Sequence, residues 1–219
     1  MSLGLVNETV TLRPGTDDDR PSDLRAFVAV AMRKQGVVGA VAPSSPSLAR
    51  ALTAVVPSSG TPLVVELGPG TGSISEAIRR GLAPGSRQLA IEVEPSMVAH
   101  LRRAKPWLEV IHGDAAELGA LLAAAGVTQV DAVVSTLPWS LFPASRQSRI
   151  LHEIGSVLAP GAAFTTVTYL HALPLPMARA FRRRLRSAFE EVLTTGPVWR
   201  NIPPGMTYVC RRPVLRAEC

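Results

Sequence analysis

The chain contains little cysteine and no long apolar run, and each shortage excludes a class of protein. Its only cysteines, Cys210 and Cys219, both lie within the last ten of its 219 residues, so a disulfide framework is excluded. No apolar run approaches the ~18 residues that a membrane-spanning helix needs. The first eight residues have neither a basic stretch nor an apolar run long enough for a signal peptide. We therefore expect a cytoplasmic protein that at most touches the inner face of a membrane.

Lysine is scarce too, although the chain is strongly basic. Among 23 basic residues only Lys34 and Lys105 are lysine, and the net charge is +6. Residues 1–23 hold two arginines and five acids, a net charge of −3, so the rest of the chain carries +9. Arginine binds phosphate through two parallel hydrogen bonds, which suits nucleic acid or phospholipid head groups. A genome rich in G and C explains the same arginine content without any such partner.

What is present suits one globular domain with many turns. Apolar residues make up 47% of the chain, and it contains 17 glycines and 19 prolines. We interpret residues 1–21 as a flexible acidic arm and residues 22–61 as an N-terminal helical segment. Within that segment, apolar spacing and capping residues predict helices over 22–35 and 46–56. Residues 62–219 then form the main domain.

Short apolar strands alternate with helices through the main domain. We expect strands at 63–67, 88–93, 107–112, 130–135 and 162–169, and helices at 73–82, 95–104, 115–125 and 144–158. An arginine-rich helix and two strands, near 191–200 and 206–212, complete the pattern. This alternation predicts an α/β fold: a Rossmann-like, doubly wound, mostly parallel seven-stranded sheet with helices on both faces.

A glycine-rich loop carries the clearest chemical signal. The segment Glu66-Leu67-Gly68-Pro69-Gly70-Thr71-Gly72 joins the first strand to its helix, where glycines permit a tight turn and close approach of a ligand. Glu92 ends the second strand, placed to accept hydrogen bonds from two ribose hydroxyls. Asp114 follows the third strand, placed to accept from an adenine amine. Together these positions predict a nucleoside pocket at the carboxyl ends of the strands.

These motifs resemble those of class I S-adenosylmethionine-dependent methyltransferases, from Leu63 to the C-terminus. The resemblance implies S-adenosyl-L-methionine as cofactor, with Glu92 at its ribose and Glu94 as a competing acid. It places the other cofactor contacts at Glu66, Gly68, Gly70, Thr71, Gly72, Asp114, Ala115 and Ser135. Residues 22–61 would cover this site. The pattern contains no metal-ligand cluster.

The acceptor end of the site is expected after the fourth and fifth strands. Ser135-Thr136-Leu137-Pro138-Trp139 is similar to the Asn-Leu-Pro-aromatic motif of amine-methylating relatives, with Thr136 in place of the amide. We expect Thr136, Pro138, Trp139 and Tyr169 to position the amine, with the Trp139 ring facing its charge. The alternative is that Pro138 and Trp139 simply cap the core.

Two flanking segments, residues 33–45 and 198–204, resemble bacterial phospholipid N-methyltransferases, which are related to ribosomal RNA adenine dimethyltransferases. The resemblance implies successive methylation of the amine of phosphatidylethanolamine at an anionic membrane surface. Arg25, Arg33, Lys34 and Arg200 would then meet lipid or substrate phosphate.

Three alternatives to a phospholipid acceptor stay open. An RNA adenine methyltransferase fits the basic charge, but Thr136 lacks the amide that recognises an adenine amine. A soluble small-molecule amine would require only a changed acceptor pocket. A cofactor-binding interaction protein would bind S-adenosylmethionine without turnover. The arginine-rich helix, with Arg179 to Arg186, is either a phosphate site or a solvated face.

Overall fold

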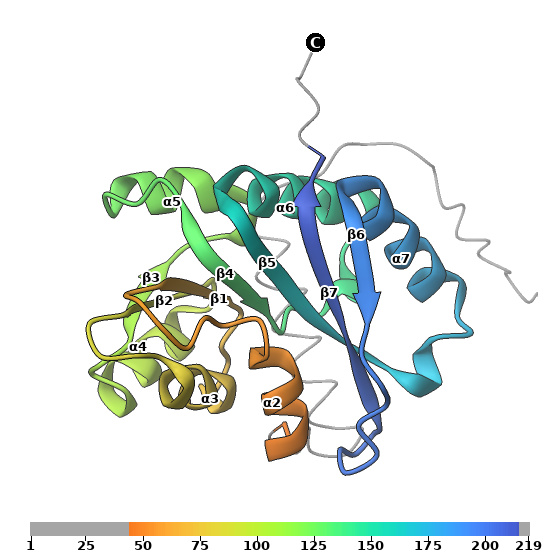
Figure 1. Cartoon of the computed structure of the whole chain (residues 1–219), viewed down its shortest axis with the longest axis horizontal. Coiled ribbons are helices and arrows are strands. Elements are labelled where there is room, and N and C mark those ends of the chain that lie inside the picture. The colour runs from red at the N-terminus through yellow and green to blue at the C-terminus, as the bar shows by residue number, and fades with distance from the viewer. Residues whose placement is uncertain (1–43, 215–219) are drawn as a thin grey trace, which may run out of the picture.

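Seven short segments form the strands of one sheet. They are β1 (Leu63–Leu67), β2 (Arg87–Glu92), β3 (Glu109–His112), β4 (Val130–Ser135), β5 (Leu158–Tyr169), β6 (Phe189–Thr194) and β7 (Gly205–Pro213). The computed structural model describes residues 44–214 and arranges the strands in the order β3-β2-β1-β4-β5-β7-β6 (Figure 1). Strands β1 to β5 pair in parallel, and β7 runs antiparallel to both β5 and β6. The predicted mostly parallel, seven-stranded sheet is confirmed.

The helices form one layer on each face of this sheet (Figure 1). They are α2 (Pro46–Thr53), α3 (Ser73–Gly81), α4 (Pro95–Ala104), α5 (Leu118–Ala124), α6 (Ala144–Val157) and α7 (Pro176–Ala188), with short 3-10 turns η1 (Ala115–Glu117), η2 (Trp139–Leu141) and η3 (Leu170–Ala172). Helices α2 and α3 pack with Val64, whereas α5, α6 and α7 pack with Val65. Adjacent residues of β1 thus serve opposite layers, as the two-residue period of a strand requires.

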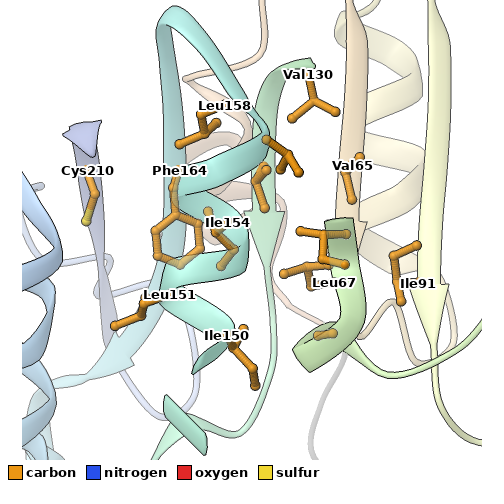
Figure 2. Close-up of a cluster of buried hydrophobic side chains, with 14 of the residues drawn as sticks. Val65, Leu67, Ile91, Val130, Ile150, Leu151, Ile154, Leu158, Phe164 and Cys210 are labelled. Atoms are coloured by element: carbon orange, nitrogen blue, oxygen red, sulfur yellow. The ribbon is translucent and has the colours of Figure 1, made fainter. Parts of the chain in front are cut away.

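The larger core lies under α5, α6 and α7. Figure 2 shows its centre, where Ile150 and Ile154 of α6 lie near Leu67 of β1 and Phe164 of β5. Each of these four side chains is almost completely buried. Because strand and helix both contribute apolar groups here, this cluster joins the sheet to the layer of α5, α6 and α7.

Several predicted boundaries differ from the observed ones for local reasons. β3 begins at Glu109, because Trp107 lies in the preceding turn and is exposed. The predicted helix over 115–125 divides into η1 and α5, with the Asp114 side chain accepting from the N–H of Ala116 at the start of η1. β6 ends at Thr194 rather than near residue 200, shortly before Gly196-Pro197, where proline cannot donate to a strand ladder.

The predicted helix over residues 22–35 lies outside the described residues, and so do Arg25, Arg33 and Lys34. The predicted helix from residue 46 is confirmed as α2, which ends three residues earlier than expected. No helix in the described range 44–214 is long and apolar enough to cross a membrane.

The chain order creates a crevice in the middle of the sheet. From β1 the chain proceeds outward to β2 and β3, then returns to form β4 on the other side of β1. The loops after β1 and β4 therefore leave in opposite directions, which is where open α/β sheets bind ligands. The glycine loop and the segment after Ser135 meet at this point.

Candidate cofactor and acceptor site

The glycine loop turns back on itself through three left-handed glycines. Gly68, Gly70 and Gly72 have φ angles of 69°, 55° and 81°. At Gly68 an added Cβ would lie 2.8 Å from Leu137 Cδ2, so the loop after β4 packs directly against it. At Gly70 no atom lies within 4 Å of an added Cβ. The loop is therefore closely packed at Gly68 and open at Gly70, where a ligand can approach the backbone.

Lys105 supports the last glycine of this loop. Its side chain runs beneath Gly72, and its buried ammonium pairs with Glu76 in the first turn of α3. A Cβ on Gly72 would overlap the Lys105 stem and come within 3.0 Å of Leu101 Cδ2. A side chain at this position would therefore have to displace Lys105 as well as adopt a left-handed φ. Sequence reasoning assigned no role to Lys105.

Glu92 is held at the end of β2 by backbone groups. Its Oε1 accepts from the N–H of Glu94 at 3.0 Å, and its Oε2 accepts from the N–H of Gly70 at 3.4 Å. The residue is 6% exposed, and burial raises the pKa of its carboxyl. Glu94 instead accepts from the Ser96 hydroxyl at 3.1 Å. Of the two competing acids, Glu92 is thus the one that contacts the glycine loop.

Asp114 follows β3 and is shared between two partners. Its Oδ1 accepts from the N–H of Ala116 at 2.8 Å, and both of its oxygens lie 2.6 Å from Arg146 Nη2. Arg146 belongs to α6. Its pairing with Asp114 was not predicted, because no local sequence pattern pairs residues 32 positions apart. A carboxylate has about four acceptor positions, so Asp114 retains capacity for one further donor such as an adenine amine.

Glu66 is completely buried beside α3 and β2. Neither carboxyl oxygen has a hydrogen-bonding partner among the described residues, and burial raises the pKa of Glu66 to about 7. Its polar neighbours are Ser75 and Gln88, and the Gln88 amide donates to the Ser75 carbonyl at 3.1 Å. The structure therefore places Glu66 beneath the glycine loop, with no surface exposed toward solvent.

The segment after β4 is joined to the glycine loop by hydrogen bonds. The Thr136 hydroxyl donates to the Gly68 carbonyl at 2.6 Å, and the Thr136 N–H donates to the Leu67 carbonyl at 3.0 Å. The buried Ser135 hydroxyl accepts from the N–H of Leu137 at 3.3 Å. Since its proton is used toward Gly68, the Thr136 oxygen keeps its lone pairs for an incoming donor.

Trp139 lies in the core rather than at the acceptor end. It is 4% exposed, its indole N–H donates to the Thr166 hydroxyl at 2.9 Å, and its ring stacks on Phe181 at 4.8 Å. Its ring faces are therefore occupied by packing, as the core-capping alternative for this segment describes. The expected contact between this ring and a cationic amine is not what the structure shows, because α7 and β5 surround the indole. Pro138 is half-buried beside it.

Tyr169 ends β5 at the same edge of the sheet. It is half-buried, its ring stacks on His171 at 5.9 Å, and burial raises the pKa of its hydroxyl. Arg200 is exposed on the β6–β7 connection. The structure thus gathers the glycine loop, Glu92, Asp114, Ser135 and Thr136 around the crevice, with Tyr169 farther along the edge. Within residues 44–214 no group of His, Cys, Asp and Glu is arranged to hold a metal ion.

Comparison with known proteins connects this geometry to a chemistry. A family model described as "Methyltransferase domain" matches residues 64–161, from β1 to the start of β5. The ornithine lipid N-methyltransferase of Singulisphaera acidiphila is 32% identical over 192 residues, covering 86% of this chain and 96% of that protein. The similarity therefore extends on both sides of the matched domain and includes part of the N-terminal segment.

Solved structures share the fold at lower identity. The O-methyltransferase TomG from Streptomyces achromogenes, in complex with SAM, is 18% identical with a TM-score of 0.61, covering 85% of this chain and 89% of that one. Human Methyltransferase-like protein 13, in complex with SAH, is 19% identical with a TM-score of 0.57, covering 74% and 79%. At such identities the likeness describes the architecture of the sheet and its helices.

Proposed function

Because the chain belongs to the S-adenosylmethionine-dependent methyltransferases and is related to bacterial lipid N-methyltransferases, we propose that it methylates the amino group of a membrane lipid. The observation that carries this proposal is the 32% identity to an ornithine lipid N-methyltransferase over 86% of this chain and 96% of that protein. The acceptor is then a primary amine on a lipid head group. Phosphatidylethanolamine and ornithine lipid both present such an amine.

The residues of the crevice suit S-adenosyl-L-methionine, the cofactor of this family. Gly70 offers open backbone, and Glu92 offers a carboxylate held in place by two N–H groups. We assign Glu92 to the ribose hydroxyls, Asp114 and Ala115 to the adenine, and the loop from Gly68 to Gly72 to the methionine part. The bound cofactor supplies a methyl group on a positively charged sulfur.

We propose that Glu66 acts on the cofactor site indirectly, from its buried position beneath the glycine loop. Because its carboxyl is closed to solvent beside Ser75 and Gln88, it supports the glycine loop rather than meeting a solvated ligand. Ser135 likewise shapes the loop after β4 through its hydrogen bond to Leu137. We infer that both are positioning residues: Ser135 acts through this hydrogen bond, and Glu66 acts by filling the space beneath the loop, since its oxygens bond to no described group.

The acceptor amine is oriented by oxygen atoms at the open side of the crevice. The Thr136 oxygen, whose own proton is donated to Gly68, accepts an amine N–H and directs the nitrogen lone pair toward the crevice. Tyr169 lines the approach from the end of β5. Alignment and exclusion of water supply the rate enhancement here, since no covalent intermediate with the chain is needed.

Incubation with alternative acceptors tests the proposal. The protein, shown to bind S-adenosylmethionine, is incubated with vesicles containing phosphatidylethanolamine or ornithine lipid, and the lipids are analysed by mass spectrometry. Stepwise addition of methyl groups to one head group supports the proposal and identifies the acceptor. Transfer to RNA adenine or to a soluble amine, with none to either lipid, would overturn it.

A further inference from the structure

The β6–β7 connection, residues 195–204, projects beyond the carboxyl end of β5. The N–H of Leu170 donates to the Pro204 carbonyl at 2.9 Å, so this connection is tied to η3 and to the chain that leads into α7. Figure 1 shows the connection at the same edge of the molecule as α2. This edge also carries Tyr169, next to the acceptor end of the proposed site.

Large apolar side chains are exposed on this edge. Trp199 is 71% exposed and Ile202 is 83% exposed, both on the β6–β7 connection. Leu175 and Met177, where α7 begins, are also exposed, but Figure 1 shows the start of α7 apart from this connection. Single exposed apolar residues are ordinary, but an exposed tryptophan and an exposed isoleucine three positions apart on one short connection indicate a contact surface.

The connection is held in shape by a buried asparagine. Asn201 is 5% exposed, its amide nitrogen donates to the Pro203 carbonyl at 2.8 Å, and its amide oxygen accepts from the N–H of Ser45 at 2.9 Å. Ser45 in turn caps α2 by accepting from the N–H of Leu48. Trp199 and Ile202 flank this anchored residue, so both are presented from a fixed backbone.

The connection itself carries charge of one sign, because residues 195–204 contain Arg200 and no acid. Residues 170–188 contain five arginines and no acid, and residues 193–214 contain three arginines and no acid. Arg211 and Arg212 lie near Glu191 and Glu190, and Arg184 donates to Gln147, whereas Arg200 is exposed between Trp199 and Asn201. Exposed tryptophan with arginine and without acids matches an anionic bilayer surface, where indole rings lie at the head-group level.

We propose that Trp199, Arg200 and Ile202 form a docking edge for an anionic phospholipid bilayer. Trp199 and Ile202 enter the head-group region, and Arg200 meets lipid phosphate. The inference deepens the proposed function, because docking here brings head-group amines to the crevice beside Tyr169. It concerns binding, however, and is tested without methyl transfer.

Vesicle binding by matched variants tests the docking edge. The double variant W199A/I202A is compared with W107A, since Trp107 is also exposed but lies at the amino end of β3, on the opposite edge of the sheet. Co-sedimentation uses vesicles of phosphatidylcholine with and without phosphatidylglycerol. We expect W199A/I202A to lose about tenfold or more in affinity for anionic vesicles, and W107A to bind like the parent chain. Equal binding by both variants overturns the proposal.

Tryptophan emission gives a second readout. The W107F variant keeps Trp139 and Trp199. Because Trp139 is buried and contributes a constant background, a change in the emission reports the surroundings of Trp199. We expect a blue shift on anionic vesicles and quenching by brominated lipid chains. Binding without either change would show that another surface docks, and would overturn the proposal.

Cofactor affinity and activity on a short-chain, water-soluble lipid amine separate the two proposals. W199A/I202A is expected to keep both, because both side chains are largely exposed and neither is assigned to the crevice. If the parent chain methylates no lipid amine, but the W199A/I202A variant binds vesicles much more weakly than the parent, the docking edge stands and the proposed function fails. If it methylates the soluble analogue but W199A/I202A binds vesicles normally, the docking edge fails alone.

Discussion

At the scale of single residues, the two glutamates at the end of β2 differ in what they touch. Glu92 is fixed against Gly70, and Glu94 accepts from Ser96. We expect E92A to weaken S-adenosylmethionine binding about tenfold to a hundredfold, because charge-assisted hydrogen bonds contribute ~1.5–3 kcal/mol. Isothermal titration with E94A as the matched control measures this. Equal losses in both variants would remove the ribose assignment of Glu92.

Glu66 makes stability depend on pH. Burial raises the pKa of this carboxyl to about 7 from 4.5, so the folded chain binds a proton that the unfolded chain has released between these values. The stability that this group contributes is therefore fully present below about pH 4.5 and is lost as pH rises to about 7, by roughly 3 kcal/mol. Denaturation of the parent chain and E66Q at both ends of this window measures the difference. If the free energies of unfolding of the parent chain and E66Q differ by the same amount at both pH values, the raised pKa of Glu66 is contradicted.

Thr136 provides a test of acceptor positioning. T136V keeps the shape of the side chain but removes both its hydrogen bond to Gly68 and its acceptor oxygen. We expect kcat/KM for the lipid amine to fall about tenfold or more, since a positioned hydrogen bond to a reacting amine contributes ~1–3 kcal/mol. T136S retains the hydroxyl and should retain most activity. Similar kinetics for T136V and the parent chain would exclude the role.

At the scale of elements, the glycine loop and α3 depend on Lys105 of the turn after α4. Gly72 needs both a left-handed φ and the space that Lys105 leaves. G72A should therefore lower the free energy of unfolding more than G126A, whose φ of 71° is equally left-handed but whose Cβ would meet nothing within 4 Å. We expect a difference of ~1–3 kcal/mol in chemical denaturation, the cost of overpacking. Equal losses would mean that backbone strain alone requires glycine.

Strand positions were predictable where apolar runs have clear ends. β1 and β4 follow Pro62 and Gln129 and end just before Gly68 and Thr136, and both have the predicted bounds. Contacts between distant elements were not predictable in the same way. Arg146 reaches Asp114 only because α6 packs beside η1, and Trp139 is enclosed because Phe181 of α7 stacks on it.

At the scale of the whole molecule, the sheet brings residues from five loops to one edge. The proposed cofactor residues follow β1, β2 and β3, the proposed acceptor residues follow β4 and β5, and the proposed docking edge lies beyond them. The family motifs indicated the first two groups in the sequence. The docking edge depends on the hydrogen bond between Ser45 and Asn201, which are 156 positions apart, so no local pattern contains it.

Mass spectrometry of lipids tests the central claim most directly. Vesicles of phosphatidylethanolamine or ornithine lipid, each mixed with phosphatidylglycerol, are incubated with the protein and S-adenosylmethionine. The account predicts stepwise methylation of a head-group amine, greatly reduced in E92A at low cofactor concentration. Cofactor binding by a folded protein with no methyl transfer to either lipid would contradict it and direct attention to a different acceptor.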